Sequence, residues 1–232
     1  MIQTFDDLSG LSAAAADTFC QLATEAIGQR GLFHVSLSGG STPRRLYELL
    51  RERELPWNDI RWYWGDERHV PHDHADSNYA MVRAALLDHL PTDQVHAFGV
   101  PTQSGDPVEV ASAYEAMLRE QFSDQDMPQW DLALLGLGDD AHTASLFPGT
   151  DAITETERWF VSNFVPKFDA YRFTLTAPAI NSARQRLFLV SGAAKQAAMQ
   201  HAVSGVPDDV NTYPSQLIRD AQWYATRDAW TG

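Results

Sequence analysis

The sequence predicts an α/β protein with a mostly parallel sheet and helices on both faces. Apolar runs of strand length alternate with helical patterns along most of the 232 residues, and such alternation indicates βαβ units. Two of these runs, 32–37 and 132–137, end in glycine-rich turns. The expected architecture is therefore a three-layer α/β/α fold of a modified Rossmann-like kind. No linker or repeat divides the sequence, so residues 1–232 are expected to form one domain.

Helices are expected where apolar residues recur with helical spacing. The first covers about 9–29, with Ser9 or Ser12 as its N-cap and Gly31 just beyond its end. In the second, Pro43 stands in the first turn, where its missing N–H costs nothing. The helices after the first are expected at 43–51, 78–90, 108–122, 177–183 and 193–203.

Strands are expected where short apolar runs lie between these helices. The segment 101–107 shows neither pattern and is expected to be a loop. The strands are expected at 32–37, 60–64, 95–98, 132–137, 159–164, 171–175, 186–191 and 223–225.

The composition argues against several classes of partner. The formal net charge is -14 and the pI about 4.8, which disfavours nucleic acids and anionic membranes. No apolar run approaches the roughly 20 residues that span a bilayer, and the N-terminus lacks a secretory signal pattern. One cysteine, Cys20, allows no internal disulfide and suits a reducing compartment. We expect a cytoplasmic protein, monomeric or weakly homo-oligomeric, whose substrate is a small molecule. An anionic substrate needs a local cluster of Arg and Lys.

The segment GLGDDAHTASLFPG, from Gly136 to Gly149, is the strongest candidate for chemistry. It follows the apolar run 132–135 and carries Asp140 two residues before His142. Histidine exchanges protons near neutral pH, and open α/β sheets bind ligands at the carboxyl ends of their strands. The alternative is structural, with Asp140 or Thr143 as a helix cap and His142 as a surface histidine.

A second glycine-rich turn, Ser38 to Pro43, joins a strand to a helix start. Its sequence SGGSTP presents backbone N–H groups and the hydroxyls of Ser41 and Thr42, which suits an anion such as phosphate. It is neither a Walker P-loop nor a nucleophile elbow. The alternative is a tight turn with a Ser or Thr cap.

Charged residues follow two further strand ends. Asp66, Glu67 and Arg68 come directly after the run 60–64, so Arg68 is a candidate for holding phosphate and Asp66 for binding sugar hydroxyls. A solvated loop is the alternative. Lys195 lies at a helix start, where a cation opposes the helix dipole and so suggests a ligand rather than a solvated side chain.

Two cofactor hypotheses are rejected. His69, His72 and His74 match no strong zinc pattern. The run Gly136 to Ala141 fits the loose dinucleotide pattern, but its two aspartates would face a pyrophosphate with like charge.

Three segments together resemble the 6-phosphogluconolactonase family of the glucosamine/galactosamine-6-phosphate isomerase superfamily. They are SGGSTPRRLYELL from Ser38, WGDERHVPHDHADSNYAMVRAALL from Trp64, and GLGDDAHTASLFPG from Gly136. Three motifs in the right order are more specific than any one. The related deaminases carry HIAFNEP where this chain has HTASLFP from His142, so the resemblance favours the lactonases.

The resemblance implies hydrolysis of 6-phospho-D-glucono-1,5-lactone to 6-phospho-D-gluconate in the oxidative pentose phosphate pathway. His142 is expected to deprotonate the attacking water and then to protonate the leaving ring oxygen. Asp140 is expected to set the tautomer of His142 or to shape the turn. Neither a metal nor an organic cofactor is expected. Two other functions stay open, namely isomerisation or deamination of an amino-sugar phosphate and non-catalytic sensing of a sugar phosphate. The residues expected to contact the substrate are Gly39, Gly40, Ser41, Thr42, Asp66, Arg68, Asn78, Arg172 and Lys195.

One position departs from the family pattern. The family usually has glycine between the aspartate and the histidine, whereas this chain has Ala141. A positive φ there would strain alanine, and nothing in the neighbouring sequence compensates such strain. We therefore expect a negative φ at Ala141, so that Ala141→Gly would lower stability by loosening the unfolded chain.

Overall fold

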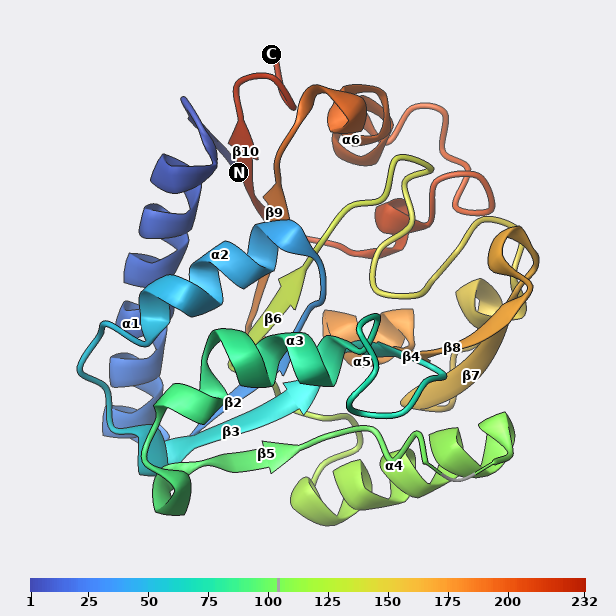
Figure 1. Cartoon of the computed structure of the whole chain (residues 1–232). Helices are drawn as coiled ribbons and strands as arrows, with labels where there is room; N and C mark the ends of the chain where they lie inside the picture. The colour runs from blue at the N-terminus through green and yellow to red at the C-terminus, as the bar shows by residue number, and fades with distance from the viewer. Residues whose placement is uncertain (104) are drawn as a thin grey trace.

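The computed structural model describes residues 1–103 and 105–232, and a seven-stranded parallel sheet lies at its centre (Figure 1). The strand order is β1-β10-β9-β6-β2-β3-β5, and every neighbouring pair is parallel. These strands are β1 (Ile2–Phe5), β2 (Phe33–Leu37), β3 (Ile60–Trp64), β5 (His96–Phe98), β6 (Leu132–Leu135), β9 (Gln185–Val190) and β10 (Gln222–Thr226). The predicted α/β fold is confirmed.

The order of the strands places the helices in two layers. The chain passes from β1 to β2, then to β3 and then to β5, and each of these steps moves toward the β5 edge of the sheet. It then passes from β5 to β6, to β9 and to β10, and each of these steps moves back toward the β1 edge. Because such crossovers are right-handed, α1, α2 and α3 cover one face and α4, α5 and α6 the other. Figure 1 shows α1, α2 and α3 grouped together. The helices are α1 (Leu8–Arg30), α2 (Ser41–Leu50), α3 (Asn78–Ala85), α4 (Pro107–Gln121), α5 (Ala177–Asn181) and α6 (Gln196–Ser204).

The direction of the connections reverses between β2 and β6, which are hydrogen-bonded neighbours. The chain leaves β2 toward one face and leaves β6 toward the other, so the loops after these strands separate. Such a switch point leaves a crevice outside the carboxyl ends of the strands, where open α/β sheets bind ligands.

A second, antiparallel sheet was not foreseen from the sequence. It comprises β4 (Asp66–Arg68), β8 (Ala170–Leu175) and β7 (Phe160–Val165). Gly65 connects the two sheets, because its N–H donates to Leu37 and its carbonyl accepts from Leu175 N–H. Strand β4 is short and charged, so no apolar pattern marks it. Its ladder with β8 pairs Arg68 with Arg172.

Several predicted boundaries differ from the structure. Strand β1 was missed, because the strand with which it pairs, β10, is distant in sequence. The predicted helix 78–90 divides into α3 and a 3₁₀ turn at Leu87–His89, and 193–203 begins with a 3₁₀ turn at Ala193–Lys195. The predicted loop 101–107 ends at Pro107, which opens α4; its residue 104 lies outside the described residues.

The predicted N-cap of the first helix was wrong. Asp7 caps α1, because its carboxylate accepts from Gly10 N–H at 2.8 Å. Ser9 lies exposed inside the first turn, and Ser12 is fully buried within the helix. The predicted end is confirmed, since Gly31 adopts φ 82° and its N–H donates to the Ile27 carbonyl.

The core consists mainly of the apolar strands and the helix faces against them. All four residues of β6 are buried, as expected for a central parallel strand covered on both faces. Tyr114 of α4 reaches the end of β3, where its hydroxyl accepts from Trp64 N–H at 2.9 Å. Among the residues described, none of the helices is both long enough and apolar enough to cross a bilayer.

We expect Asp7→Ala to lower the free energy of unfolding by about 1 kcal/mol, because α1 loses its side-chain cap. Urea denaturation measures the change. Ser9→Ala is the matched control and should leave stability nearly unchanged. A larger loss from Ser9→Ala than from Asp7→Ala would contradict the assignment of the cap.

Candidate active site

A pocket of about 180 Å³ lies outside the carboxyl ends of four neighbouring strands, β9, β6, β2 and β3. It includes the switch point between β2 and β6. Its lining residues are Ser38, Gly39 and Gly40 after β2, Asp66 and Arg68 after β3, Gly136, Leu137, Gly138, His142 and Ala144 after β6, and Lys195 after β9. The structure therefore brings the predicted motifs together at one edge of the sheet.

The His142 ring is closely packed. The Phe147 ring stacks on it at 4.0 Å between centroids, with 25° between the planes. A Cβ at Gly138 would stand only 2.0 Å from His142 Nδ1, so a larger residue there would displace the imidazole. Gly138 N–H also donates to the His142 carbonyl at 2.8 Å. Position and ring plane are thus determined locally.

Asp140 determines the tautomer of His142. Its Oδ1 lies 2.5 Å from His142 Nδ1, so Nδ1 carries the proton and Nε2 is left as the basic nitrogen. Its Oδ2 accepts from Lys167 Nζ at 2.8 Å. Partial burial acts to raise the pKa of Asp140, but the hydrogen bonds from His142 and Lys167 outweigh it and hold the pKa well below its usual range. The carboxylate therefore stays charged at neutral pH.

The expected negative φ at Ala141 was wrong. Ala141 adopts φ 59° and Ala144 φ 47°, a left-handed region that costs alanine energy. The turn imposes this conformation, because Ala141 N–H donates to Gly138 and the Ala141 carbonyl accepts from Ser215 N–H at 3.0 Å. Two strained alanines therefore flank His142.

The loop after β2 presents an uncapped helix end to the pocket. Gly40, with φ 102°, is the N-cap of α2 and makes no side-chain cap bond, so the alternative of a Ser or Thr cap was wrong. The Tyr47 hydroxyl anchors the loop by bonding both the N–H and the carbonyl of Ser38. Ser41 is exposed and Thr42 half-buried in the first turn of α2; neither lines the pocket.

Asn78 packs against the loop that follows β2. Its side chain is 2% exposed and donates to the Asp66 carbonyl at 3.0 Å. A Cβ at Gly39 would lie 1.9 Å from its Oδ1, so the glycine allows close packing between the first and second motifs. Asn78 does not line the pocket. These contacts favour a supporting role over the substrate contact that the resemblance implied.

Glu67 anchors the second motif. It is 1% exposed and accepts hydrogen bonds from the N–H groups of Arg68, Asn78 and Tyr79 and from the Ser77 hydroxyl. Burial raises the pKa of Glu67 despite these bonds. The adjacent Asp66 lines the pocket and accepts from the Ser145 hydroxyl at 3.0 Å. The segment 66–78 is thus an ordered support for the pocket.

Three cations lie in this region without a carboxylate partner. Within residues 1–103 and 105–232, none of Arg68, Arg172 and Lys195 has a carboxylate within 4.0 Å. Arg68 instead donates to the Asp76 carbonyl at 2.7 Å. Directly opposed like charges on paired strands repel, and Arg68 and Arg172 are such a pair. An anion would relieve this repulsion. Arg68 and Lys195 line the pocket, whereas Arg172 does not and is the β8 residue paired with Arg68.

The three loop histidines have separate contacts. His72 Nε2 lies 2.6 Å from the Val100 carbonyl oxygen, His69 packs edge-on against Phe173, and His74 Nδ1 accepts from Asp76 N–H. In the described part of the chain, no group of three or more His, Cys, Asp or Glu side chains is arranged to hold a metal ion.

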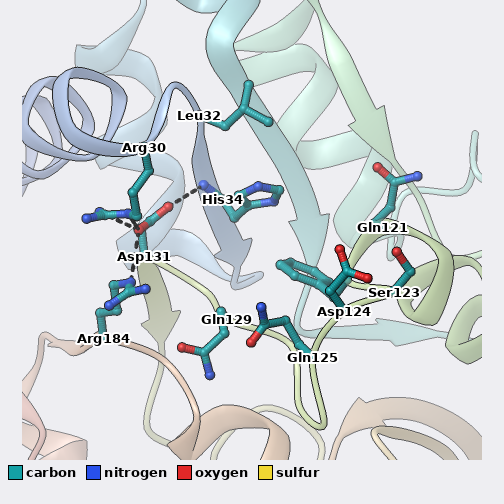
Figure 2. Close-up of a pocket in the computed structure, with 11 residues that line it drawn as sticks. Arg30, Leu32, His34, Gln121, Ser123, Asp124, Gln125, Gln129, Asp131 and Arg184 are labelled. Carbon is teal, nitrogen blue, oxygen red and sulfur yellow. Dashed lines mark hydrogen bonds and ion pairs between the residues drawn. The ribbon is translucent and has the colours of Figure 1, made fainter.

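A larger hollow of about 300 Å³ lies at the opposite edge, beside the amino ends of β2, β6 and β9 (Figure 2). The buried carboxylate in this hollow, Asp131, already has protein partners. It accepts from Arg30 at 2.7 Å and from His34 N–H at 2.9 Å, and it lies 3.5 Å from Arg184. Because open α/β sheets bind ligands at the carboxyl edge, the pocket around His142 is the stronger candidate.

Sequence reasoning missed Lys167 and Phe147 as parts of the site. Phe147 belongs to the third motif, but no function was assigned to it from the sequence. Lys167 lies in no motif, but one signal was available. The chain has only two lysines, Lys167 and Lys195, against 15 arginines; in the structure Lys167 contacts the third motif at Asp140, and Lys195 lines the pocket.

Comparison with known proteins identifies the family of this chain. The family model described as glucosamine-6-phosphate isomerases/6-phosphogluconolactonase matches residues 6–229, and the chain belongs to this family. It is 41% identical over 223 residues to a 6-phosphogluconolactonase of Nostoc sp., covering 94% of this chain and 90% of the relative. It is 44% identical over 199 residues to that of Synechocystis sp., covering 84% and 81%. The solved 6-phosphogluconolactonase from Trypanosoma cruzi superposes with a TM-score of 0.86 at 29% identity, over 98% of this chain and 94% of that one.

We expect Ala141→Gly to raise the free energy of unfolding by about 0.5–1 kcal/mol. Glycine relieves the left-handed strain, and this gain exceeds the entropy that it adds to the unfolded chain. Thermal and urea denaturation measure the change. Ala75→Gly, at an exposed loop alanine without positive φ, is the control and should lose stability. A destabilised Ala141→Gly protein would show that the turn is not strained.

Proposed function

We propose that this chain hydrolyses 6-phospho-D-glucono-1,5-lactone to 6-phospho-D-gluconate, the lactonase step of the oxidative pentose phosphate pathway. The observation that carries the proposal is His142, which lines the pocket, is oriented by Asp140 and lies in the same pocket as Arg68 and Lys195, two cations with no carboxylate within 4.0 Å among the described residues. The names of its relatives support the choice of substrate. We further propose that residues 1–232 act as one domain.

In the proposed mechanism His142 is the general base. Its Nε2 takes a proton from a water molecule, which attacks the lactone carbonyl carbon. The ester bond to the ring oxygen then breaks, and His142 returns the proton to that oxygen. Asp140 holds the Nδ1 proton and stabilises the imidazolium between these steps. Backbone N–H groups of the glycine-rich turns are candidate donors to the oxyanion.

The phosphate is proposed to lie between the start of α2 and the cations. Gly39 and Gly40 allow close approach to the uncapped N–H groups, and an anion at a helix N-terminus is favoured by the dipole. Arg68 and Lys195 supply charge from two other strand ends, with Arg172 reinforcing Arg68. Ser41 and Thr42 remain candidate donors, and Asp66 is a candidate acceptor for a sugar hydroxyl. The site as proposed needs neither a metal nor an organic cofactor.

The function is tested with freshly prepared 6-phosphogluconolactone. The protein should accelerate acid release above spontaneous hydrolysis and release no ammonia from glucosamine 6-phosphate. His142→Ala should lower kcat by roughly 10²–10⁴-fold, the usual contribution of a positioned acid–base group, with little change in KM.

The matched control is His89→Ala, because His89 is exposed and does not line the pocket. It should keep normal turnover. Ammonia release from the amino sugar would support the isomerase or deaminase alternative, and binding of either compound without turnover would support a sensor. Normal turnover by folded His142→Ala would falsify the role of the histidine.

The phosphate site predicts a substrate-dependent defect. Arg68→Ala and Lys195→Ala should each raise KM for the phosphorylated lactone by roughly tenfold or more, since a hydrogen bond to a charged group contributes about 1.5–3 kcal/mol. Unphosphorylated gluconolactone is the comparison substrate and should be affected far less. Equal losses on both substrates would show that these residues do not recognise the phosphate.

A further inference from the structure

The turn between β7 and β8 contacts Asp140 and Phe147, the two residues whose side chains hold the His142 ring. It is a single 3₁₀ turn, Pro166–Phe168, which opens on a proline and closes at Asp169 with φ 48°. The two strands that it joins pair along their whole length, from Phe160 with Leu175 to Val165 with Ala170. The ladder and the proline therefore hold the turn in place beside the loop that carries Asp140.

Two adjacent residues of this turn contact the two groups that hold the His142 ring. Lys167 Nζ donates to Asp140 Oδ2 at 2.8 Å, and the Phe168 ring packs edge-on against Phe147 at 5.6 Å. Neither residue lines the pocket itself. The turn thus supports the Asp140 side and the Phe147 side of the imidazole at once.

The two oxygens of Asp140 have different partners. Oδ1 faces His142, and Oδ2 faces Lys167. Rotation of the carboxylate would break both contacts together. The Asp140 and His142 side chains are each about a quarter exposed, so water would otherwise compete for the carboxylate. The Lys167 ion pair resists that competition.

A lysine suits this position better than an arginine. The ammonium is a compact point charge that takes one oxygen, whereas a guanidinium forks onto both oxygens of a carboxylate. A guanidinium bound to both oxygens of Asp140 would compete with His142 Nδ1 for Oδ1. Lys167 Nζ donates to Asp140 Oδ2 at 2.8 Å and lies farther, 3.6 Å, from Asp139 Oδ1, so the ammonium takes only one of the two oxygens of Asp140.

We propose that Lys167 is a positioning residue for the catalytic pair: it holds Oδ2 of Asp140 so that Oδ1 stays on His142 Nδ1. Its effect on catalysis passes through Asp140 alone, and this part of the inference rests on the lactonase function proposed above. The contact itself is independent of that function and is measurable without substrate.

The kinetic test is a double-mutant cycle of Lys167→Met with Asp140→Asn. Lys167→Met should lower kcat about five- to thirtyfold, a range typical of partners in one hydrogen-bond network, with KM unchanged. In the Asp140→Asn background it should have no further effect. Lys167→Arg should retain part of the activity. An equal further loss in the Asp140→Asn background, or a defect confined to KM, would overturn the proposal.

Arg53→Met is the matched control. The Arg53 side chain is about as exposed as that of Lys167 and forms an ion pair with Asp17 at 2.6 Å, and neither residue lines the pocket. It should leave kcat and KM unchanged. A loss comparable to that of Lys167→Met would show that removing any such surface cation lowers activity, which would also overturn the proposal.

The contact is tested separately by NMR of protein labelled in its lysines. Only two side-chain ammonium signals are expected, and Lys167→Met assigns them. The hydrogen bond to Asp140 raises the pKa of Lys167, and the nearby Asp139 carboxylate adds a smaller effect in the same direction. Asp140→Asn should therefore lower the midpoint of the Lys167 titration. An unchanged Lys167 titration would refute the ion pair. Wild-type protein that shows the ion pair but no lactonase activity would instead reject the proposed function.

Discussion

The parallel pairing of β2 with β6 on one side and β3 on the other is the constraint on which the site depends. Parallel strands end at the same edge of the sheet, so loops that are about 100 residues apart in the chain meet there. The reversal of connection direction between β2 and β6 separates two of those loops and opens the pocket between them. Residues at the carboxyl ends of β3 and β9 then complete its walls.

Close packing at that edge holds the chemical groups in place. Gly138 and Phe147 both pack closely against the His142 ring, and Asn78 packs directly onto Gly39. The cost is backbone strain at Ala141 and Ala144, each held at positive φ. Strain of this kind persists only where the surrounding structure determines the conformation. Here the hydrogen bonds of the turn do so, and the strained residues flank the imidazole.

Local charge in the pocket opposes the charge of the whole chain. The protein carries -14 overall, yet Arg68, Arg172 and Lys195 gather at one sheet edge without carboxylate partners among the described residues. The paired arginines repel each other, and this unfavourable arrangement is reasonable where an anionic ligand binds. At the Asp140 side Lys167 is paired instead, so one cation supports the proposed catalytic pair and the others remain available for the proposed phosphate site.

Alternating apolar runs were enough to predict the α/β fold, because buried parallel strands need continuous apolar sequence. The three motifs likewise indicated His142, Asp140, Gly39, Gly40 and Arg68, because glycine-rich strand ends carry their chemistry locally. Only the tertiary structure decided the rest. Strand β4 and the φ of Ala141 depend on hydrogen bonds to distant segments. Lys167 reaches Asp140 across 27 positions, and no local pattern encodes a contact that forms only when two separate loops pack together.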